Sequence, residues 1–416
     1  MKELERILNC ENVGAFVKGE REIMIMENAT LGDYETHLVA LKRNGFEVYA
    51  ENKIADNMFA TLENETLTVT IYFVKSEGKI RVISEPRKAL YPRKEDNVYA
   101  TTDKQNLLTA IKGDLSYEES SMSYVIRLSD GSFIIIDGGL GTGPDPENLL
   151  NMLKSQSKDM EKPVVSAWIF THCHDDHIGT FNVFSPKYHD SIVVERIYYN
   201  FQTDEDILQG NGKFMLDDSN EKYKDLRYNN FKKVLENYYP SVPKIIPHTG
   251  DKYYIKNAVI DVLYTWEDKL PEDVKTINNS STVFKLTING QTMLITGDIE
   301  SKDITESIVE RYGDFVKCDF VQAPHHGLTN HVPFYQYVNP TYFLLPINHQ
   351  GFNSVLDNEG YNPANYWLAH VSEKMRHVVT TGNGTVSIPL PFNPSEEEAV
   401  KAPKWSTVFK DYSHLY

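Results

Sequence analysis

Alternation of apolar and polar residues predicts a small α+β unit in the first 90 residues. Residues 67–74 alternate between aliphatic or aromatic side chains and threonine or tyrosine, as a strand with one buried face does. A helix is predicted from residue 31 to about 44, where Thr30 and Asp33 form a capping pattern. Further strands are predicted at residues 22–27, 46–50, 58–62 and 79–83. This unit is interpreted as a cap or dimerisation module, with substrate binding as the alternative.

A change of composition divides the chain into two expected domains. Residues 86–97 carry two prolines and a cluster of charge, which is typical of a linker. We therefore expect a small α+β domain of unknown role at 1–90, a linker at 91–115 and a larger α/β domain at 116–416.

The larger domain begins with apolar runs that end in polar residues. Strands are predicted at 123–128 and 133–136, and the second ends in Asp137 followed by two glycines. A helix at 147–153 leads to a strand at 164–170, rich in β-branched and aromatic residues. Polar residues at strand ends are where α/β folds place their chemistry.

The most informative stretch directly follows that last buried strand. It has the pattern His-x-His-x-Asp-His, formed by His172, His174, Asp176 and His177. Side chains two apart in extended chain point the same way, so the first two histidines can hold one metal ion. The other two residues follow a turn, at the start of a helix, and can face a second ion. Such a cluster after a core strand favours a metal site over a polar surface loop.

The second half of the larger domain also has predicted strands that lead to polar residues. Strands at 283–288 and 292–296 flank Asn289-Gly290, a specific hairpin signal, and the second strand leads to Asp298. A later strand at 319–324 leads to His325 and His326. Near the end, a helix is expected near residues 364–372, and a strand pair is expected to turn at residues 382–384.

Cysteine usage and charge narrow the class of protein. The chain has three cysteines, Cys10, Cys173 and Cys318. Their number is odd and they are far apart in the sequence, which indicates a reducing compartment and no disulfide bonds. Cys173 should point away from the neighbouring histidines, so we expect a buried residue that is not a ligand. The net charge of −17 disfavours nucleic acid and anionic membranes as partners. No apolar run approaches a membrane-spanning length, so a cytoplasmic location is expected.

The histidine-rich string resembles the signature of the metallo-β-lactamase-fold hydrolases. The resemblance implies an αββα sandwich of two similar halves, with one or two metals at its edge. It also implies that Asp137 accepts hydrogen bonds from the metal loop, that Asp298 bridges two ions and that His325 completes the second site. His325 is preferred over His326 because it follows the predicted strand more closely.

A finer resemblance rests on the order of three motifs. Asn-Asn-Ser-Ser at 278–281, Thr-Gly-Asp and His-His-Gly resemble the metallo-β-lactamase-type domain of bacterial competence DNA-uptake channels. They are more distantly similar to the choline-phosphate esterases that act on teichoic acid. The resemblance covers residues 115 to 392, and residues 200–240 look like an insertion that shapes the pocket.

One departure from the family pattern concerns the first metal. A further histidine is common after the strand that ends here near Leu263, and this chain has none there. His248 is the nearest candidate, and we interpret it as a loop histidine unconnected to metal. The first site would then take only His172, His174 and Asp298 from the protein.

These observations predict a metal-dependent hydrolase that uses a metal-bound hydroxide. The expected cofactors are two divalent ions, zinc preferred, with manganese or iron as alternatives. The expected substrate is a phosphodiester or phosphomonoester, in a small molecule or a polymer. Asp176 can orient the attacking water, and His326 is then available as a proton donor or substrate contact.

Three alternatives remain open at this point. A carboxylic ester, lactone or thioester hydrolase would use the same metals. A metal-binding interaction module would not need Asp176 and Asp298 together. Redox use of a di-iron site would need an electron carrier, and the sequence shows no flavin-binding pattern.

Overall fold

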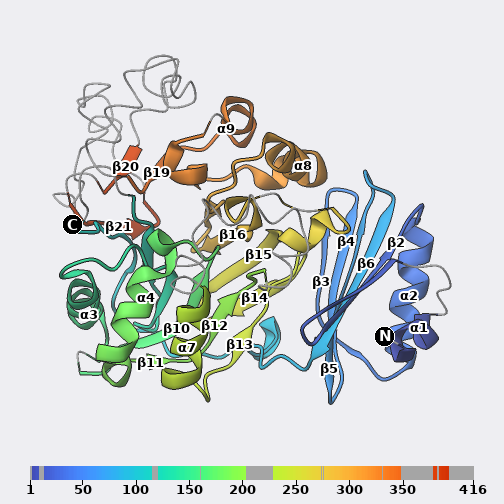
Figure 1. Cartoon of the computed structure of the whole chain (residues 1–416), viewed down its shortest axis with the longest axis horizontal. Coiled ribbons are helices and arrows are strands. Elements are labelled where there is room, and N and C mark those ends of the chain that lie inside the picture. Colours follow the sequence, from blue (N-terminus) through green and yellow to red (C-terminus); the bar gives the residue numbers. More distant parts are fainter. Residues whose placement is uncertain are drawn as a thin grey trace.

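Three β-sheets form the framework of the protein in a computed structural model (Figure 1). The structure describes residues 2–8, 14–114, 120–159, 161–202, 228–272, 274, 276–329, 331–347, 378–381 and 384–392. Two of the sheets stack face to face, and the third stands beside them at the N-terminal end of the chain.

The N-terminal sheet is six-stranded and wholly antiparallel. Its strands, in spatial order, are β1 (Gly14–Lys18), β2 (Arg21–Met26), β6 (Lys79–Pro86), β5 (Leu67–Val74), β4 (Asn57–Glu63) and β3 (Glu47–Ile54). Helices α1 (Lys2–Leu8) and α2 (Leu31–Arg43) cover one face. The predicted capping box at Thr30 and Asp33 is present at the start of α2. The opposite face packs against the larger domain.

The first sheet of the sandwich contains both parallel and antiparallel pairs. Its order is β13 (Lys244–Ile245), β12 (Ile197–Tyr199), β10 (Val164–Phe170), β9 (Phe133–Asp137), β8 (Ser123–Arg127), β7 (Asn106–Ala110) and β21 (Val386–Leu390), with β11 (Val193–Val194) also paired to β10. Helices α3 (Asp145–Gln156), α4 (Asp175–Tyr188) and α7 (Tyr228–Tyr238) cover its outer face, and most of their buried apolar side chains join those of β9 and β10.

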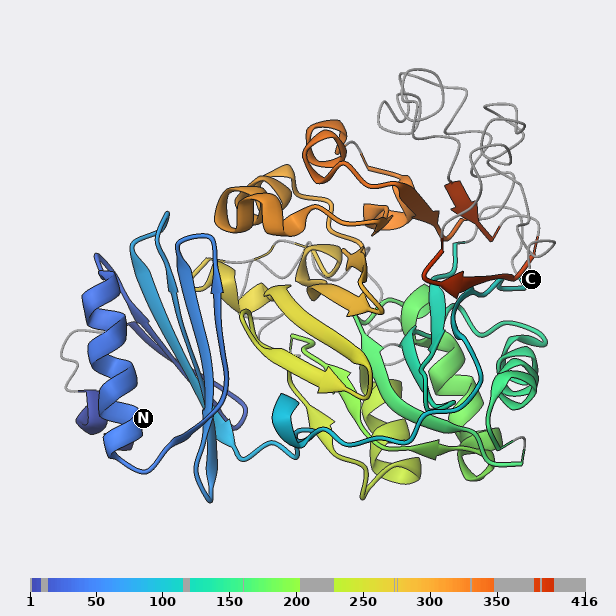
Figure 2. The same ribbon diagram turned by 180° about the vertical axis from the view of Figure 1, so that it is seen from behind.

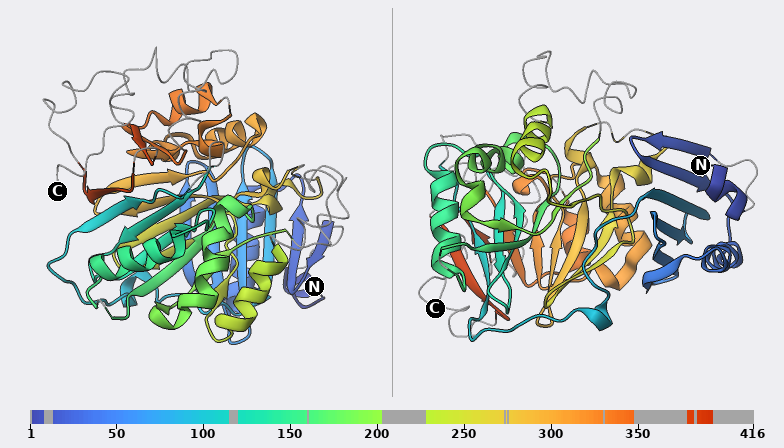
Figure 3. Two further views of the ribbon diagram at one scale, coloured as in Figure 1. Left: turned by 60° about the vertical axis from the view of Figure 1, so that its left-hand side comes forward. Right: turned by 90° about the horizontal axis from the view of Figure 1, so that it is seen from below.

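The second sheet of the sandwich is seven-stranded. Its order is β14 (Lys252–Ile255), β15 (Ala258–Tyr264), β16 (Val283–Ile288), β17 (Gln291–Ile295), β18 (Phe320–Gln322), β19 (Tyr342–Leu345) and β20 (Val378–Thr380). Helices α8 (Lys302–Tyr312) and α9 (Val332–Val338) cover its outer face. Aliphatic and aromatic side chains of the two sheets meet between them. The layers therefore follow the predicted αββα order, as two further views show (Figure 3).

Short 3₁₀ turns complete the described secondary structure. They are η1 (Lys94–Asp96), η2 (His189–Ser191), η3 (Trp266–Lys269), η4 (Asn278–Ser280), η5 (Gly313–Val316) and η6 (Pro324–Gly327).

Two expectations about chain connections are wrong. The linker predicted at 91–115 is too long, because residues 106–110 form β7, which pairs with β8 and β21. Residues 87–105 run along the base of the sandwich, where the Tyr91 hydroxyl donates to the carbonyl of Ser166 (Figure 2). The strands expected to pair around residues 382–384 lie in different sheets, β20 in the second and β21 in the first. The helix expected near 364–372 lies outside the described residues.

A buried polar interface joins the N-terminal sheet to the sandwich. We define it by Arg21, Glu85, Lys88, His248, Asp251 and Glu267, all less than 10% exposed. The ring of His248 lies 2.6 Å from Glu85 Oε1 on one side and 2.6 Å from Glu267 Oε2 on the other. Lys88 Nζ lies 3.1 Å from Asp251 Oδ2, and Arg21 pairs with Glu267. Each charge thus has a partner, as burial requires.

The charge on His248 should make stability depend on pH. Burial and Lys88 oppose protonation of its ring, but Glu267 and Glu85 outweigh them and raise its pKa to about 9. Because the unfolded pKa is lower, the stabilisation is complete below pH ~6.5 and is lost as pH rises through ~9. The expected loss is about 3 kcal/mol in the free energy of unfolding.

Urea unfolding of the full chain at pH 6 and pH 10 measures this effect. His248→Gln should remove that part of the pH dependence, whereas His189→Gln, near the surface, should keep it. The same pH dependence in all three proteins would contradict the assignment.

Candidate metal centre

The first part of the site follows β10, between two neighbouring strands of its sheet. Residues 171–174 follow the strand and have no regular secondary structure. Helix α4 then begins at Asp175, with His174 as its N-cap residue. His172 Nε2 and His174 Nδ1 lie 3.1 Å apart, so the two rings meet as the sequence predicted. Asp176 and His177 lie in the first turn of α4, also as predicted.

The second part comes from the other sheet. The loop after β17 is held by Thr296 N–H, which donates to Gln322, and by Asp298 N–H, which donates to Ser281. Asp298 is only 1% exposed. Its Oδ2 lies 3.2 Å from His177 Nε2, 3.3 Å from His326 Nε2 and 3.7 Å from His172 Nε2. The two halves of the sandwich therefore meet at this carboxylate.

Two groups of candidate ligands result, and they share Asp298. One group is Asp176, His177, Asp298 and His326, and the other is His172, His174 and Asp298. Within each group the candidate ligand atoms lie within 4.8 Å of one another. A shared carboxylate between two sets of imidazoles is the arrangement that a two-metal site requires.

Unpaired buried atoms support this interpretation. Nε2 of His177, Nε2 of His326 and Oδ1 of Asp298 are buried and have no hydrogen-bond partner among the described residues. His326 Nε2 nevertheless approaches Asp176 Oδ2 to 2.9 Å. Buried polar atoms this close together, without hydrogen-bond partners, are arranged as the ligands of a metal ion would be. Nitrogen and carboxylate donors of this kind fit zinc, iron or manganese.

The electrostatics of the site also favour a cation. Burial lowers the pKa of His172 well below its ordinary value, which keeps the ring neutral as a ligand must be. Burial opposes the charge on His177 and His326 as well, but the neighbouring carboxylates, Asp298 foremost, outweigh it. They raise the pKa of His177 well above its ordinary value and that of His326 to about 10. The potential that retains these protons would equally attract a divalent cation in their place.

Asp137 contacts the histidine loop on the side away from the candidate ligand atoms, as the resemblance implied. Its carboxylate accepts hydrogen bonds from the backbone N–H and the hydroxyl of Thr171, both at 2.8 Å, and lies 2.8 Å from His177 Nδ1. It is fully buried. An acceptor at Nδ1 directs Nε2 of the same ring toward the cluster.

The choice between the two adjacent histidines is corrected by the geometry. His326 enters the cluster, and its Nδ1 donates to the carbonyl of Pro346 at 2.9 Å. His325 lies outside the cluster, 3.3 Å from Glu300, and its side chain is 26% exposed. The prediction assumed that extended chain continues to His325, but β18 ends at Gln322. Both histidines then adopt positive φ angles, of 50° and 54°, which turn the second one inward.

Cys173 and His248 are two residues that the sequence analysis considered and did not assign as ligands. Cys173 is buried in the apolar core beside α4 and belongs to neither ligand group. His248 lies in the polar interface and likewise belongs to neither group. Of the predicted insertion, residues 203–227 lie outside the described residues, and α7 forms most of the rest.

Ser120 is a site residue that the sequence did not indicate. Its hydroxyl donates to Asp176 Oδ2 at 2.7 Å, and Met122 N–H donates to the backbone carbonyl of Asp176 at 3.0 Å. The segment before β8 thus holds both ends of this aspartate. A serine beside acidic residues, without apolar periodicity, carries no recognisable signal in the sequence.

Replacing Ser120 with alanine should weaken metal binding. Loss of a hydrogen bond that orients a ligand raises the metal dissociation constant by about 10- to 100-fold. Competition with a chromophoric chelator measures this change without any substrate. Ser123→Ala is the matched control, because the buried hydroxyl of Ser123 has no partner among the described residues. Equal affinities in the two variants would contradict the role of Ser120.

The fold and the paired clusters define a class of protein. Histidine and aspartate ligands at one edge of an αββα sandwich are the arrangement of a hydrolase-type, metal-binding member of that fold. The sequence profile of the metallo-β-lactamase superfamily matches residues 117–332, more than half of the chain. The chain belongs to this superfamily.

The chain is similar to several solved structures at low sequence identity. The metallo-β-lactamase fold protein YhfI from Bacillus subtilis is 13% identical, with a TM-score of 0.38, over 68% of this chain and 100% of that chain. A diphosphatase of the PhnP family is 12% identical, with a TM-score of 0.38, over 70% and 100% of the two chains. CmlA, a diiron β-hydroxylase from Streptomyces venezuelae, is 12% identical, with a TM-score of 0.39, over 70% of this chain and 55% of its own.

Two other comparisons complete these findings. A search of curated proteins gave no significant match. Within the described residues, no helix combines the length and the apolar character needed to cross a bilayer. The finer likeness to the competence-channel domain stays a prediction.

Proposed function

We propose that this protein is a metal-dependent hydrolase of phosphodiesters or phosphomonoesters. The observation that carries the proposal is the pair of ligand groups that share Asp298. Two divalent ions held there would activate water and neutralise charge that develops on phosphoryl oxygens. The preference for phosphoesters rests on the order of the Asn-Asn-Ser-Ser, Thr-Gly-Asp and His-His-Gly motifs.

The residues around the two proposed ions have different roles. His172, His174 and Asp298 are one set of ligands, and Asp176, His177 and His326 complete the other. The side chain of Asp176 contacts His326 and is 22% exposed. It can therefore also orient a water molecule at the mouth of the site.

His325 takes the substrate-facing place that the sequence assigned to His326. Its side chain is 26% exposed, and its Nδ1 lies 3.3 Å from Glu300 Oε1. Glu300 in turn accepts hydrogen bonds from Asn278 and Thr276. An imidazole next to His326 can donate a hydrogen bond to a phosphoryl or leaving-group oxygen.

Hydrolysis of bis(p-nitrophenyl) phosphate and p-nitrophenyl phosphate by the Zn²⁺- or Mn²⁺-loaded protein tests this function. We expect turnover that Asp176→Asn abolishes. Asp175→Asn is the matched control, because this neighbouring carboxylate belongs to neither ligand group and its variant should remain active. Turnover of p-nitrophenyl acetate but of neither phosphoester would reject the proposal in favour of carboxylic ester hydrolysis.

A further inference from the structure

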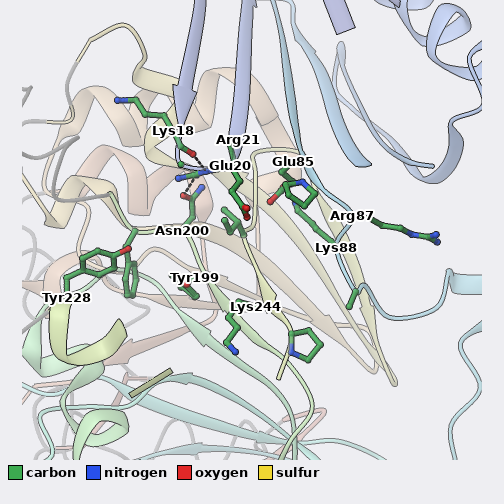
Figure 4. A pocket seen from close by; sticks show the side chains of 16 residues that line it. Lys18, Glu20, Arg21, Glu85, Arg87, Lys88, Tyr199, Asn200, Tyr228 and Lys244 are labelled. Carbon is green, nitrogen blue, oxygen red and sulfur yellow. Dashed lines mark hydrogen bonds and ion pairs between the residues drawn. The ribbon is translucent and has the colours of Figure 1, made fainter. Parts of the chain in front are cut away.

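A cavity of about 500 Å³ lies between the N-terminal sheet and the sandwich. Its walls are the β1–β2 turn, the residues after β6, the residues that follow β12 and β13, and the start of α7 (Figure 4). None of the candidate metal ligands lines it among the described residues. The volume lies within the range of small-molecule sites, roughly 300–1,000 Å³.

The cavity opens at the edge of the sheet where ligands of α/β folds bind. Strands β10 and β12 are parallel, and Phe170 pairs with Tyr199. His172 follows the end of one strand, and Asn200 and Phe201 follow the end of the other. The cavity therefore lies at the carboxyl ends of the same parallel strands as the metal centre, beyond β12.

Arg21 provides a fixed cationic donor in the wall of the cavity. Its Nη1 donates to Asn200 Oδ1 at 2.8 Å and pairs with Glu267, and its Nε donates to the carbonyl of Lys18 at 3.3 Å. The side chain is only 6% exposed, and no described residue accepts from Nη2.

Asn200 is itself held in place, which fixes Arg21 further. It donates to the carbonyl of Pro247 at 2.9 Å and also accepts from Trp266 Nε1 at 3.0 Å. A guanidinium fixed on two sides is pre-organised for an anion, because little side-chain entropy is lost on binding.

Basic side chains outnumber acidic ones among the residues that line the cavity. Five basic side chains line it, those of Lys18, Arg21, Arg87, Lys88 and Lys244, against the carboxylates of Glu20 and Glu85. Lys88 and Glu85 pair with each other at 2.8 Å, and Lys18 and Arg87 extend outward from the rim (Figure 4). On a chain of net charge −17, this rim is a local site of attraction for anions.

Aromatic side chains form another part of the wall. The rings of Tyr199 and Phe201 have centroids 5.3 Å apart, and those of Phe201 and Tyr228 are 6.1 Å apart. All three residues line the cavity. They offer an apolar surface for the uncharged part of a ligand.

We propose that this cavity binds a small organic anion. Its phosphate or carboxylate group pairs with Arg21, and its apolar or aromatic part packs on Tyr199, Phe201 and Tyr228. The inference concerns binding alone and does not depend on hydrolysis at the metal centre.

Isothermal titration calorimetry of the full-length, metal-loaded protein tests the proposal. The probes are AMP, adenosine, inorganic phosphate and citrate, and each titration is repeated after removal of metal with EDTA. We expect AMP to bind in both states, and adenosine to bind at least tenfold more weakly. Comparison of inorganic phosphate with citrate shows whether the cavity binds a phosphate group or a carboxylate group more tightly. Binding that disappears on metal removal, or no binding of any anion at millimolar concentration, would overturn the proposal.

Two pairs of variants locate the binding. Ala89 is exposed and lines the cavity, so Ala89→Glu should weaken AMP binding at least tenfold, whereas the exposed Ala100→Glu should not. Arg21→Gln should also weaken it at least tenfold. Its control is Arg311→Gln, which removes a buried arginine paired with Asp268 and Glu77, away from the cavity. Unchanged affinity in Ala89→Glu would place the ligand elsewhere, whether or not Arg21→Gln folds.

Discussion

Asp298→Asn is expected to reduce hydrolysis by at least about a thousandfold. This side chain is the member common to both ligand groups and is buried between His172, His177 and His326. The amide has nearly the same shape but lacks the negative charge, and its NH₂ group would face a cation. One substitution therefore affects both proposed ions while the apolar core is unchanged.

The kcat for bis(p-nitrophenyl) phosphate, measured with Zn²⁺ or Mn²⁺ in excess, checks this expectation. Asp303→Asn is the matched control, because Asp303 is an exposed carboxylate in the first turn of α8, five residues further on. Comparable rates in the two variants would show that Asp298 is not essential to the site.

Gly179→Ala is expected to have the largest effect on stability, with a loss of about 3 kcal/mol or more. A Cβ atom at Gly179 would lie 2.0 Å from the carbonyl oxygen of Leu140 and 2.6 Å from its carbonyl carbon. Both are backbone atoms, so no side-chain rotation relieves the clash. The contact also positions the metal ligands, because Thr180 N–H donates to the carbonyl of Gly139 at 2.9 Å, one helical turn after Asp176.

Chemical denaturation compares this variant with Gly32→Ala. Gly32 lies in α2, and the nearest atom to its added Cβ would be Thr30 Oγ1 at an ordinary 3.7 Å. Alanine is the better helix former, so stability there should stay the same or rise by up to about 1 kcal/mol. If Gly179→Ala were as stable as Gly32→Ala, the close approach of α4 to the glycine loop would not be required.

Local pattern was sufficient to predict much of this fold. The alternation at 67–74, the capping box at Thr30 and the Asn289-Gly290 turn each specify their structure from neighbouring residues alone. The same holds for the string from His172 to His177, because one strand end and one helix start position all four side chains. Short-range geometry is fixed by the backbone, so it can be read from residue order.

Features that depend on distant segments escaped prediction. His326 turns inward because the two residues after Pro324 have positive φ angles. The residue types at these positions do not predict such angles. Ser120 meets Asp176 across 56 residues, and Arg21 meets Glu267 across 246. The anion cavity likewise exists only because two sheets meet. Such contacts are set by packing, which sequence spacing does not encode.

Metal stoichiometry tests the central claim, a two-metal centre shared between the halves of the sandwich, most directly. Native mass spectrometry of the full-length protein in Zn²⁺ should show two ions per chain. Asp298→Asn should lose both ions, and Asp303→Asn should keep them. A single ion in the wild-type protein, or two ions retained in Asp298→Asn, would contradict a centre built around a shared carboxylate.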